Sequence, residues 1–156
     1  MEDIRIRPYK RTDEFAAMNV WLRSWKEMEE FRHIDFGARL WAFRKKWIDS
    51  IVPVAQIRVA EISGEIAGVV TIEPQICYLE QLFVAPEYKG RGVGEALINV
   101  VKRLSPGMIN LAVNERNPRA VAFYLKHGFA QRERYIDPIS GEPILMMIWK
   151  GGVPRE

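Results

Sequence analysis

The chain has 156 residues, of which 48% are hydrophobic and 28% charged, and its 23 basic and 20 acidic side chains give a formal net charge of +3. This length suits one domain, expected over 1–150 with a short C-terminal tail at 151–156, while no apolar run reaches the roughly 20 residues of a membrane-spanning helix. The dispersed charge does not indicate a nucleic-acid surface, and one cysteine with two histidines predicts neither an internal disulfide nor a metal site.

The amino-terminal residues are acidic and then alternate between apolar and basic, as in Ile4, Arg5 and Ile6. A secretory signal would be basic and then continuously apolar, so a cytoplasmic protein is expected. The alternation itself predicts a first strand over residues 4–8. Two helices are expected next, from apolar residues at helical spacing. The first set is Phe15, Met18, Leu22 and Trp25 behind a cap at Thr12 or Asp13, and the second is Phe36, Leu40, Phe43 and Trp47.

A β-meander is predicted after these helices. Residues 56–62 and 66–72 have the pattern of two strands joined by a turn at 63–65, and a third strand over 76–84 ends at Ala85-Pro86. A glycine-rich loop at 89–94 leads into a helix over 93–104. A strand at 108–113, a helix between Asn117 and Gly128, and a closing hairpin of 129–136 and 144–149 complete the pattern.

The loop Lys89-Gly90-Arg91-Gly92-Val93-Gly94 lies at the start of a predicted helix, where free backbone N–H groups and the helix dipole favour an anion. Its three glycines can adopt positive φ and let a pyrophosphate approach closely, while Lys89 and Arg91 add positive charge. Such a loop can also be a plain strand-to-helix turn. The NTP-binding loop and the dinucleotide fingerprint are both absent, so a nucleotide-linked thioester carrier fits better.

Two blocks of sequence resemble the GNAT superfamily of N-acetyltransferases: residues 81–94, QLFVAPEYKGRGVG, and residues 113–129, VNERNPRAVAFYLKHGF. With the order of elements, the resemblance extends from Ile4 to Trp149. It implies an α/β (α+β) GNAT fold, in which a central mixed, mostly antiparallel sheet of six to seven strands has splayed middle strands and about four flanking helices. Lys89 departs from the family, which usually has Arg or Gln there. Because backbone N–H groups form most of the cradle, we expect only a modest change of affinity.

The resemblance implies acetyl-CoA as the co-substrate, without a metal. In the family, the strand that matches 78–84 is bulged and splays from the next strand, so its backbone can pair with the pantetheine arm. Carried over to this chain, the cofactor-binding residues are Leu82, Phe83, Val84, Lys89, Gly90, Arg91, Gly92, Val93, Gly94, Asn117 and Tyr124. Asn117 is also expected to cap its helix.

Acetyl transfer to an amine requires a base, an oxyanion donor and an acid for the departing thiolate. Tyr124 matches the family tyrosine that hydrogen-bonds the leaving sulfur, although an ordinary core aromatic could occupy the same position. The N–H of Val84 matches the oxyanion donor. Strand alternation places Tyr78, Glu80 and Leu82 on one face, so Glu80 is the candidate base. The alternative is a salt-bridged surface glutamate, with water removing the proton.

The acceptor site is expected between the two early helices and the final hairpin, which flank the splayed strands in this fold. Exposed members of the set Trp21, Trp25, Trp41 and Trp47 would form an aromatic wall, but core packing at helical spacing is favoured. Glu27, Glu29 and Glu30 could attract a cationic substrate or lie on a solvated face. His33 and His127 are expected to be surface or capping residues.

These inferences predict direct acetyl transfer from acetyl-CoA to a primary amine of a small molecule or peptide, within a ternary complex. A non-catalytic acyl-CoA-binding regulatory module is the alternative. A covalent relay through Cys77 is not expected, because the flanking Ile76 and Tyr78 suggest a buried thiol. The last strands of such folds often pair between subunits, so the resemblance is also compatible with a homodimer.

Overall fold

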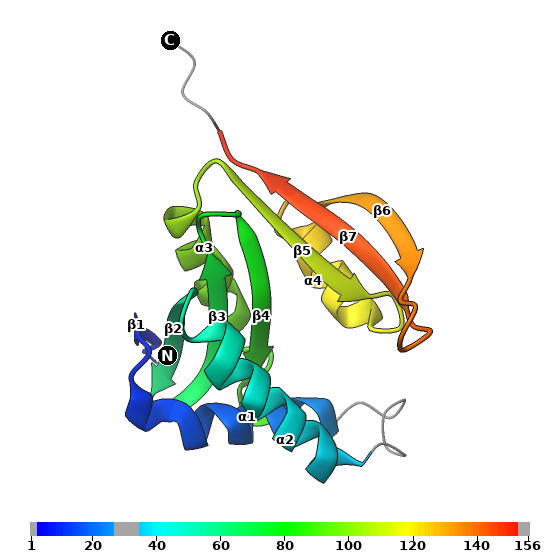
Figure 1. Ribbon diagram of the computed structural model, residues 1–156. Helices are drawn as coiled ribbons and strands as arrows, with labels where there is room; N and C mark the ends of the chain where they lie inside the picture. The colour runs from blue at the N-terminus through cyan, green and yellow to red at the C-terminus, as the bar shows by residue number, and fades with distance from the viewer. Residues whose placement is uncertain (1–2, 27–34, 153–156) are drawn as a thin grey trace.

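The structure, a computed structural model, describes residues 3–26 and 35–152. Within these ranges, seven strands form one sheet in the order β1-β2-β3-β4-β5-β7-β6 (Figure 1). The strands are β1 (Arg5–Pro8), β2 (Gln56–Ile62), β3 (Glu65–Glu73), β4 (Tyr78–Val84), β5 (Met108–Asn114), β6 (Ala130–Ile136) and β7 (Pro143–Lys150). The α-helices are α1 (Glu14–Lys26), α2 (Phe36–Lys46), α3 (Val93–Leu104) and α4 (Pro118–Lys126). The predicted α/β architecture, a mixed and mostly antiparallel sheet flanked by about four helices, is confirmed.

Strands β4 and β5 are parallel neighbours that separate almost at once. Their register contains a single pair, Tyr78 opposite Asn110, supported by a hydrogen bond of 2.7 Å from the Asn110 N–H to the Cys77 carbonyl. By contrast, β3 pairs with β4, and β5 with β7, along most of their lengths. The two strands therefore diverge into a V (Figure 1), and the predicted splay of the middle strands is confirmed.

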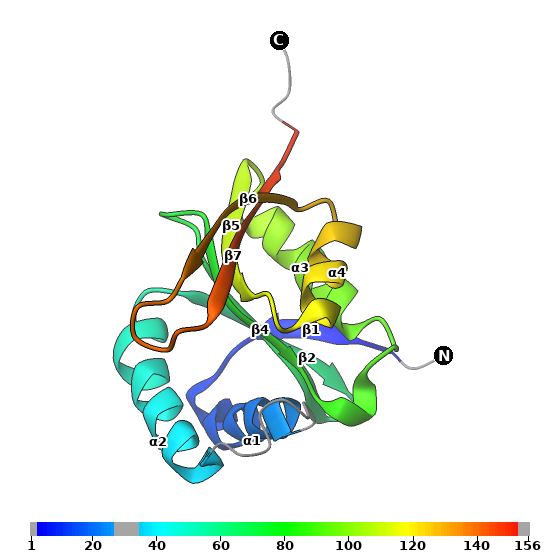
Figure 2. The same cartoon turned by 90° about the vertical axis from the view of Figure 1, so that its right-hand side faces the viewer.

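Helices α3 and α4 cover one face of the sheet, and α1 and α2 cover the other (Figure 2). On the first face, Val93, Leu97, Ile98 and Val101 of α3 are all buried against β-strand side chains. Gly68 of β3 makes this contact possible, because a Cβ there would lie 2.9 Å from Val93 Cγ1 and 3.0 Å from Leu97 Cδ1. The start of α3 thus lies directly on the sheet, close to the end of β4.

On the second face, aromatic rings join the two early helices to β4. The Trp21 and Phe43 rings stack with centroids 4.2 Å apart, and Phe83 of β4 meets the rings of Phe43 and Trp47 edge-on at 6.3 and 6.4 Å. After α2 the chain continues into a π-helical turn, η3 (Trp47–Ile51), whose Trp47 is fully buried. Aromatic packing therefore fixes α2 beside β4.

Some predicted boundaries and faces differ from the structure. Helix α1 begins at Glu14, and the predicted cap residues Thr12 and Asp13 lie in a preceding 3₁₀ turn, η1 (Arg11–Asp13), where the Asp13 side chain accepts the Lys10 N–H. Phe15, placed on the apolar face by its spacing, is 85% exposed, since the buried side of α1 is formed by residues such as Ala17 and Trp21. No helix in the described ranges is long and apolar enough to cross a membrane.

Candidate active site

A glycine-rich loop follows β4 and the 3₁₀ turn η4 (Pro86–Tyr88) and leads into α3. Gly90 and Gly92 have φ of +77° and +87°, and Gly92 is the N-cap of α3 in a left-handed conformation. The first amide to bond back is that of Ala96, to the Gly92 carbonyl at 3.0 Å. The amides of residues 93–95 therefore precede the helical ladder, in the position where a helix binds an anion.

Gly94 has a different role from the one predicted. It lies inside the first turn of α3 and is not among the glycines with positive φ. A Cβ at this position would lie 3.0 Å from Cε1 and 3.2 Å from Cζ of Phe123. Gly94 therefore lets the start of α3 approach the Phe123 ring in the middle of α4.

Positive side chains accompany the loop, as the sequence predicted. The guanidinium carbon of Arg91 lies 5.5 Å from the centroid of the Tyr88 ring, within the range of a cation–π contact. Glu87 of η4 pairs with Arg23 of α1 at 2.5 Å, which ties the loop to the opposite helical layer. Hydrogen bonding to Arg23 lowers the pKa of Glu87, so this carboxylate stays ionised beside the cradle.

Tyr124 is buried on α4 and belongs to the same core as Leu82 and Val84 of β4. Its ring meets the rings of Phe123 and Phe129 edge-on, at 5.3 and 5.4 Å. Burial raises the pKa of the Tyr124 phenol, which therefore remains protonated at neutral pH and can donate a proton. Such burial is equally expected of a core aromatic, the other interpretation of this residue.

The helix that carries Tyr124 is bounded as predicted. The Asn117 side chain accepts a hydrogen bond of 3.2 Å from the Ala120 N–H, and Pro118 occupies the first turn. Beyond the helix, Gly128 has φ of +90°. His127 is the C-cap and its ring lies 4.5 Å from that of Phe123, which confirms the expected capping position.

Glu80 lies at a bulge in β4. Gln81 is opposite Thr71 and Leu79 is opposite Ile72, so Glu80 is an extra residue without a partner position on β3. The bulge interrupts the alternation of side chains. Leu82 consequently packs with the α3–α4 core, whereas Glu80 forms an ion pair of 3.0 Å with Lys46 Nζ of α2. The prediction that Glu80 and Leu82 share a face is wrong for this reason.

A small pocket lies beside Glu80, on the α2 side of β4. It is lined by Ser50, Ile51, Val54, Ala55, Glu73, Tyr78 and Glu80. Burial, with further contributions from the charges of Glu80 and Tyr135, raises the pKa of Tyr78 to about 12. Tyr78 was not predicted as a functional residue, although its position two residues before the candidate base could have suggested it. The pocket brings two carboxylates and a protonated phenol together.

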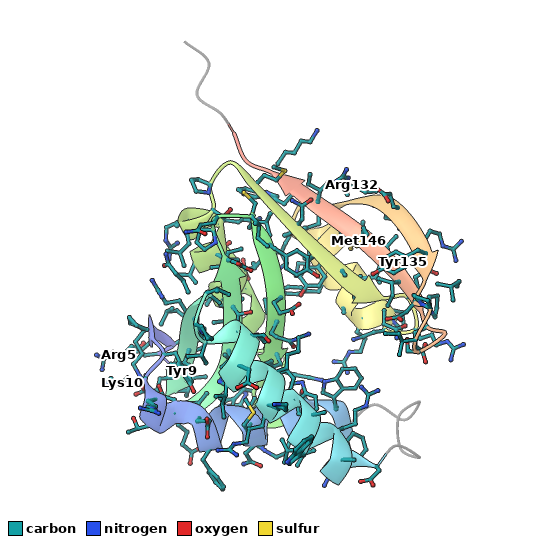
Figure 3. All side chains as sticks on the ribbon, in the orientation of Figure 1. Arg5, Tyr9, Lys10, Arg132, Tyr135 and Met146 are labelled. Carbon is teal, nitrogen blue, oxygen red and sulfur yellow. The ribbon has the colours of Figure 1, made fainter. Side chains whose placement is uncertain are left out.

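The β6–β7 hairpin stands on the other side of the V (Figure 1) and carries Arg132, Tyr135 and Met146 (Figure 3). Arg132 donates a hydrogen bond of 3.3 Å to Oδ1 of Asn110, the residue where β5 meets β4. Tyr135 is 46% exposed and acts electrostatically on Tyr78. The hairpin thus lies near Tyr78, which lines the pocket beside Glu80, and the location of the acceptor site stays a prediction.

The remaining candidates on the early helices are mostly structural. Trp21 and Trp47 are buried, Trp25 is half-buried with the Arg39 guanidinium 5.2 Å from its ring, and Trp41 is 70% exposed. Core packing is therefore confirmed for Trp21 and Trp47.

The acidic candidates Glu27, Glu29 and Glu30, together with His33, lie outside the described residues. Cys77 is half-buried rather than buried, with Sγ 3.8 Å from the Pro74 carbonyl oxygen.

Comparisons with known proteins agree with this architecture. The family model "Acetyltransferase (GNAT) family" matches residues 15–129. The peptidyl-lysine N-acetyltransferase YjaB of Salmonella typhimurium is 28% identical over 127 residues, covering 81% of this chain and 83% of that protein. The peptidyl-lysine N-acetyltransferase YiaC of Escherichia coli is 31% identical over 125 residues, covering 80% and 82%.

Solved structures show the same fold. The solution structure of apo-form YjaB from Escherichia coli has a TM-score of 0.78 and 25% identity, covering 96% of this chain and 99% of that one. The PaiA N-acetyltransferase of Thermoplasma acidophilum, solved in complex with coenzyme A, has a TM-score of 0.70 and 18% identity, covering 95% and 99%.

A splayed sheet with a glycine-rich helix start beside it, together with these relatives, defines an acyltransferase. The chain belongs to the GNAT family of N-acetyltransferases, whose model covers most of its length. The family uses acetyl-CoA as the acyl donor. The predicted class of enzyme is thereby confirmed.

Proposed function

We propose that this N-acetyltransferase moves an acetyl group from acetyl-CoA directly onto the primary amine of a lysine side chain in a peptide, within a ternary complex. The observation that carries the proposal is the single residue pair between β4 and β5, which leaves the edge of β4 beyond Tyr78 open to a ligand. Relatives named peptidyl-lysine N-acetyltransferases support peptide lysine over other amines.

The residues around the V suit acetyl-CoA. Amides at the start of α3, with the positive side chains of Lys89 and Arg91, would hold the diphosphate. A Cβ at Gly90 would meet nothing within 4 Å, so this side of the loop has room for a phosphate group. Leu82, Phe83 and Val84 pair with β3 on one side only, and their other edge would receive the pantetheine arm. Asn117, at the start of α4, would contact the same arm.

The bound coenzyme supplies an activated thioester, and the chain supplies the proton transfers. Glu80 would accept the proton of the acceptor ammonium, directly or through water. The N–H of Val84 would stabilise the oxyanion that develops on the carbonyl oxygen. Tyr124, protonated and buried, would donate to the departing thiolate. The pocket beside Glu80 favours a cationic side chain, because Glu73 and Glu80 both line it.

Thiol release from acetyl-CoA, measured with lysine peptides, polyamines and free amino acids, tests the proposal. We expect release with lysine peptides, intersecting lines in double-reciprocal plots as in a ternary complex, and a fall in kcat of about 100-fold in Glu80→Gln. Parallel lines would instead indicate a covalent relay. Tight acetyl-CoA binding by calorimetry without release for any amine would favour the non-catalytic module.

A homodimer and a cytoplasmic location stay predictions, and sedimentation and cell fractionation would test them.

A further inference from the structure

We propose that the enzyme acetylates its own Lys46, by intramolecular transfer at the site described above. The proposal rests on the proposed function, because it requires the same acetyl donor and the same base. The observation behind it is the distance of 3.0 Å between Lys46 Nζ and Glu80 Oε1. A primary amine of the chain itself therefore lies within hydrogen-bond reach of the candidate base, where an acceptor amine must be.

Packing of α2 on the sheet keeps Lys46 in this place. Phe43 and Trp47, on either side of it in sequence, are buried and contact Phe83 of β4. Phe83 lies three residues beyond Glu80 on the same strand, so the aromatic contact fixes the end of α2 next to the bulge. The Lys46 side chain remains 49% exposed, and its flexible methylene stem is free to move.

A geometry that makes Glu80 the base for a peptide lysine also leaves the tethered amine of Lys46 in contact with that base. Glu80, the candidate base, and Val84, the candidate oxyanion donor, are four strand positions apart, about 13 Å along the backbone. The acceptor lysine and the thioester together must occupy the space between these two residues. Lys46 already contacts the base, and because it belongs to the same molecule it loses no free energy of association. Tethering of the reacting groups raises their effective concentration strongly, so the Lys46 side chain needs to reach the thioester only a small part of the time.

The reaction balances with acetyl-CoA as the only co-reactant. The Lys46 nitrogen attacks the thioester carbon, a C–N bond forms and the C–S bond breaks. The ammonium loses two protons in total. Glu80 takes one and passes it to water, and the other replaces the proton that Tyr124 gives to the thiolate. The products are acetyl-Lys46 and free coenzyme A, and the ion pair with Glu80 is lost because the amide carries no charge.

Lys45 offers a matched control within the same helix. Its Nζ lies 3.0 Å from Asp49, and its side chain is 64% exposed, more than that of Lys46. Non-enzymatic acetylation by acetyl-CoA would therefore modify Lys45 at least as readily. Cleavage before aspartates releases residues 35–48 as one peptide, whose lysines are Lys45 and Lys46. Fragment ions of this peptide distinguish the two sites.

The experiment incubates the full chain with acetyl-CoA and no added acceptor, and follows peptide 35–48 by mass spectrometry. We expect one acetyl group on Lys46, at a first-order rate that does not change when the protein is diluted. Lys46→Arg should leave the peptide unmodified, Lys45→Arg should not affect acetylation, and Glu80→Gln should slow it by at least about tenfold. Circular dichroism and thermal unfolding of each variant show that the fold is kept.

Equal modification of Lys45 and Lys46, or a rate that rises in proportion to protein concentration, would overturn the proposal. A lysine peptide assayed in parallel separates the two conclusions. If the peptide is acetylated and Lys46 is not, the self-acetylation is wrong and the proposed function stands. If neither is acetylated, the proposed function itself fails.

Discussion

Tyr124 and Glu80, the candidate acid and base, lie on opposite faces of β4. Tyr124 belongs to the core beneath α3 and α4, whereas Glu80 turns toward α2, where it pairs with Lys46. The bulge at Glu80 produces this division, since it lets neighbouring parts of one strand face two different layers. Leaving-group chemistry and amine chemistry would then occur on separate sides of the sheet, with the thioester between them in the V.

The tyrosine provides a prediction at the residue scale. Tyr124→Phe removes the proton donor but keeps the ring that packs against Phe123 and Phe129. We expect kcat for acetyl transfer to fall by about 100-fold, while KM for acetyl-CoA changes little. Steady-state kinetics with varied acetyl-CoA provide the measurement, and thermal unfolding serves as the control for the fold. An unchanged kcat would identify Tyr124 as a packing residue.

At the scale of elements, the η1 turn connects the edge strand β1 to the start of α1. Asp13 accepts two hydrogen bonds from Arg7 of β1, at 2.8 and 2.9 Å, and a third from the Lys10 N–H at 2.7 Å. Arg7 also binds Glu61 of the neighbouring strand β2. A mostly buried guanidinium thus joins three elements at the edge of the sheet, far from the V.

This connection makes a prediction about acid stability. The hydrogen bond from Arg7 is the main cause that lowers the pKa of Asp13, and the Lys10 N–H adds to it. Because the pKa of Asp13 is lower in the folded than in the unfolded chain, its ionised carboxylate stabilises the protein at pH values above the unfolded-state pKa of about 3.9. This stabilisation is lost as the pH falls through the folded-state pKa. Asp13→Asn should cost about 1–3 kcal/mol of unfolding free energy at pH 7 and show a smaller further loss in acid.

Urea unfolding at pH 7 and below pH 4 measures the effect. Asp49→Asn is the matched control, because Asp49 is 55% exposed in its pair with Lys45 and should change the unfolding free energy by less than about 1 kcal/mol. Equal effects of the two substitutions at pH 7 would show that the Asp13 contacts contribute no more than a surface ion pair.

At the scale of the whole molecule, the sheet consists of two halves, β1–β4 and β5–β7, joined through the pair Tyr78 and Asn110. A coenzyme in the V would bond to β4 and to the starts of both α3 and α4. Ligand binding should therefore stabilise both halves of the sheet together, because groups on both sides of the V would contact the same molecule.

Hydrogen exchange with and without acetyl-CoA tests this coupling. We expect slower exchange of the amides at 82–84 and 90–95, together with those at the start of α4, while β1 and β2 change little. The unfolding free energy should rise by about 2.7 kcal/mol when the ligand is present at 100 times its Kd. Protection confined to one half of the sheet would contradict binding within the V.

Much of the fold could be predicted from local patterns. The strands of the meander, helix α3 and the Asn117 cap depend on hydrophobic period, turn residues and side-chain hydrogen bonds within a few positions. The exposure of Phe15 escaped prediction, since the orientation of α1 depends on which rings of α2 and β4 it meets. Helical spacing alone does not say which part of an apolar stripe is covered.

The order of elements, the glycine-rich helix start and the family could be recognised from the amino-acid sequence, because contiguous residues encode them. Three features became visible only in the folded chain: Gly94 contacts Phe123, Glu80 turns away from Leu82, and Lys46 reaches Glu80. Each of these depends on how two elements distant in the chain are placed against each other. Register between β3 and β4, and the docking of α2 on Phe83, are properties of packing that no single segment carries.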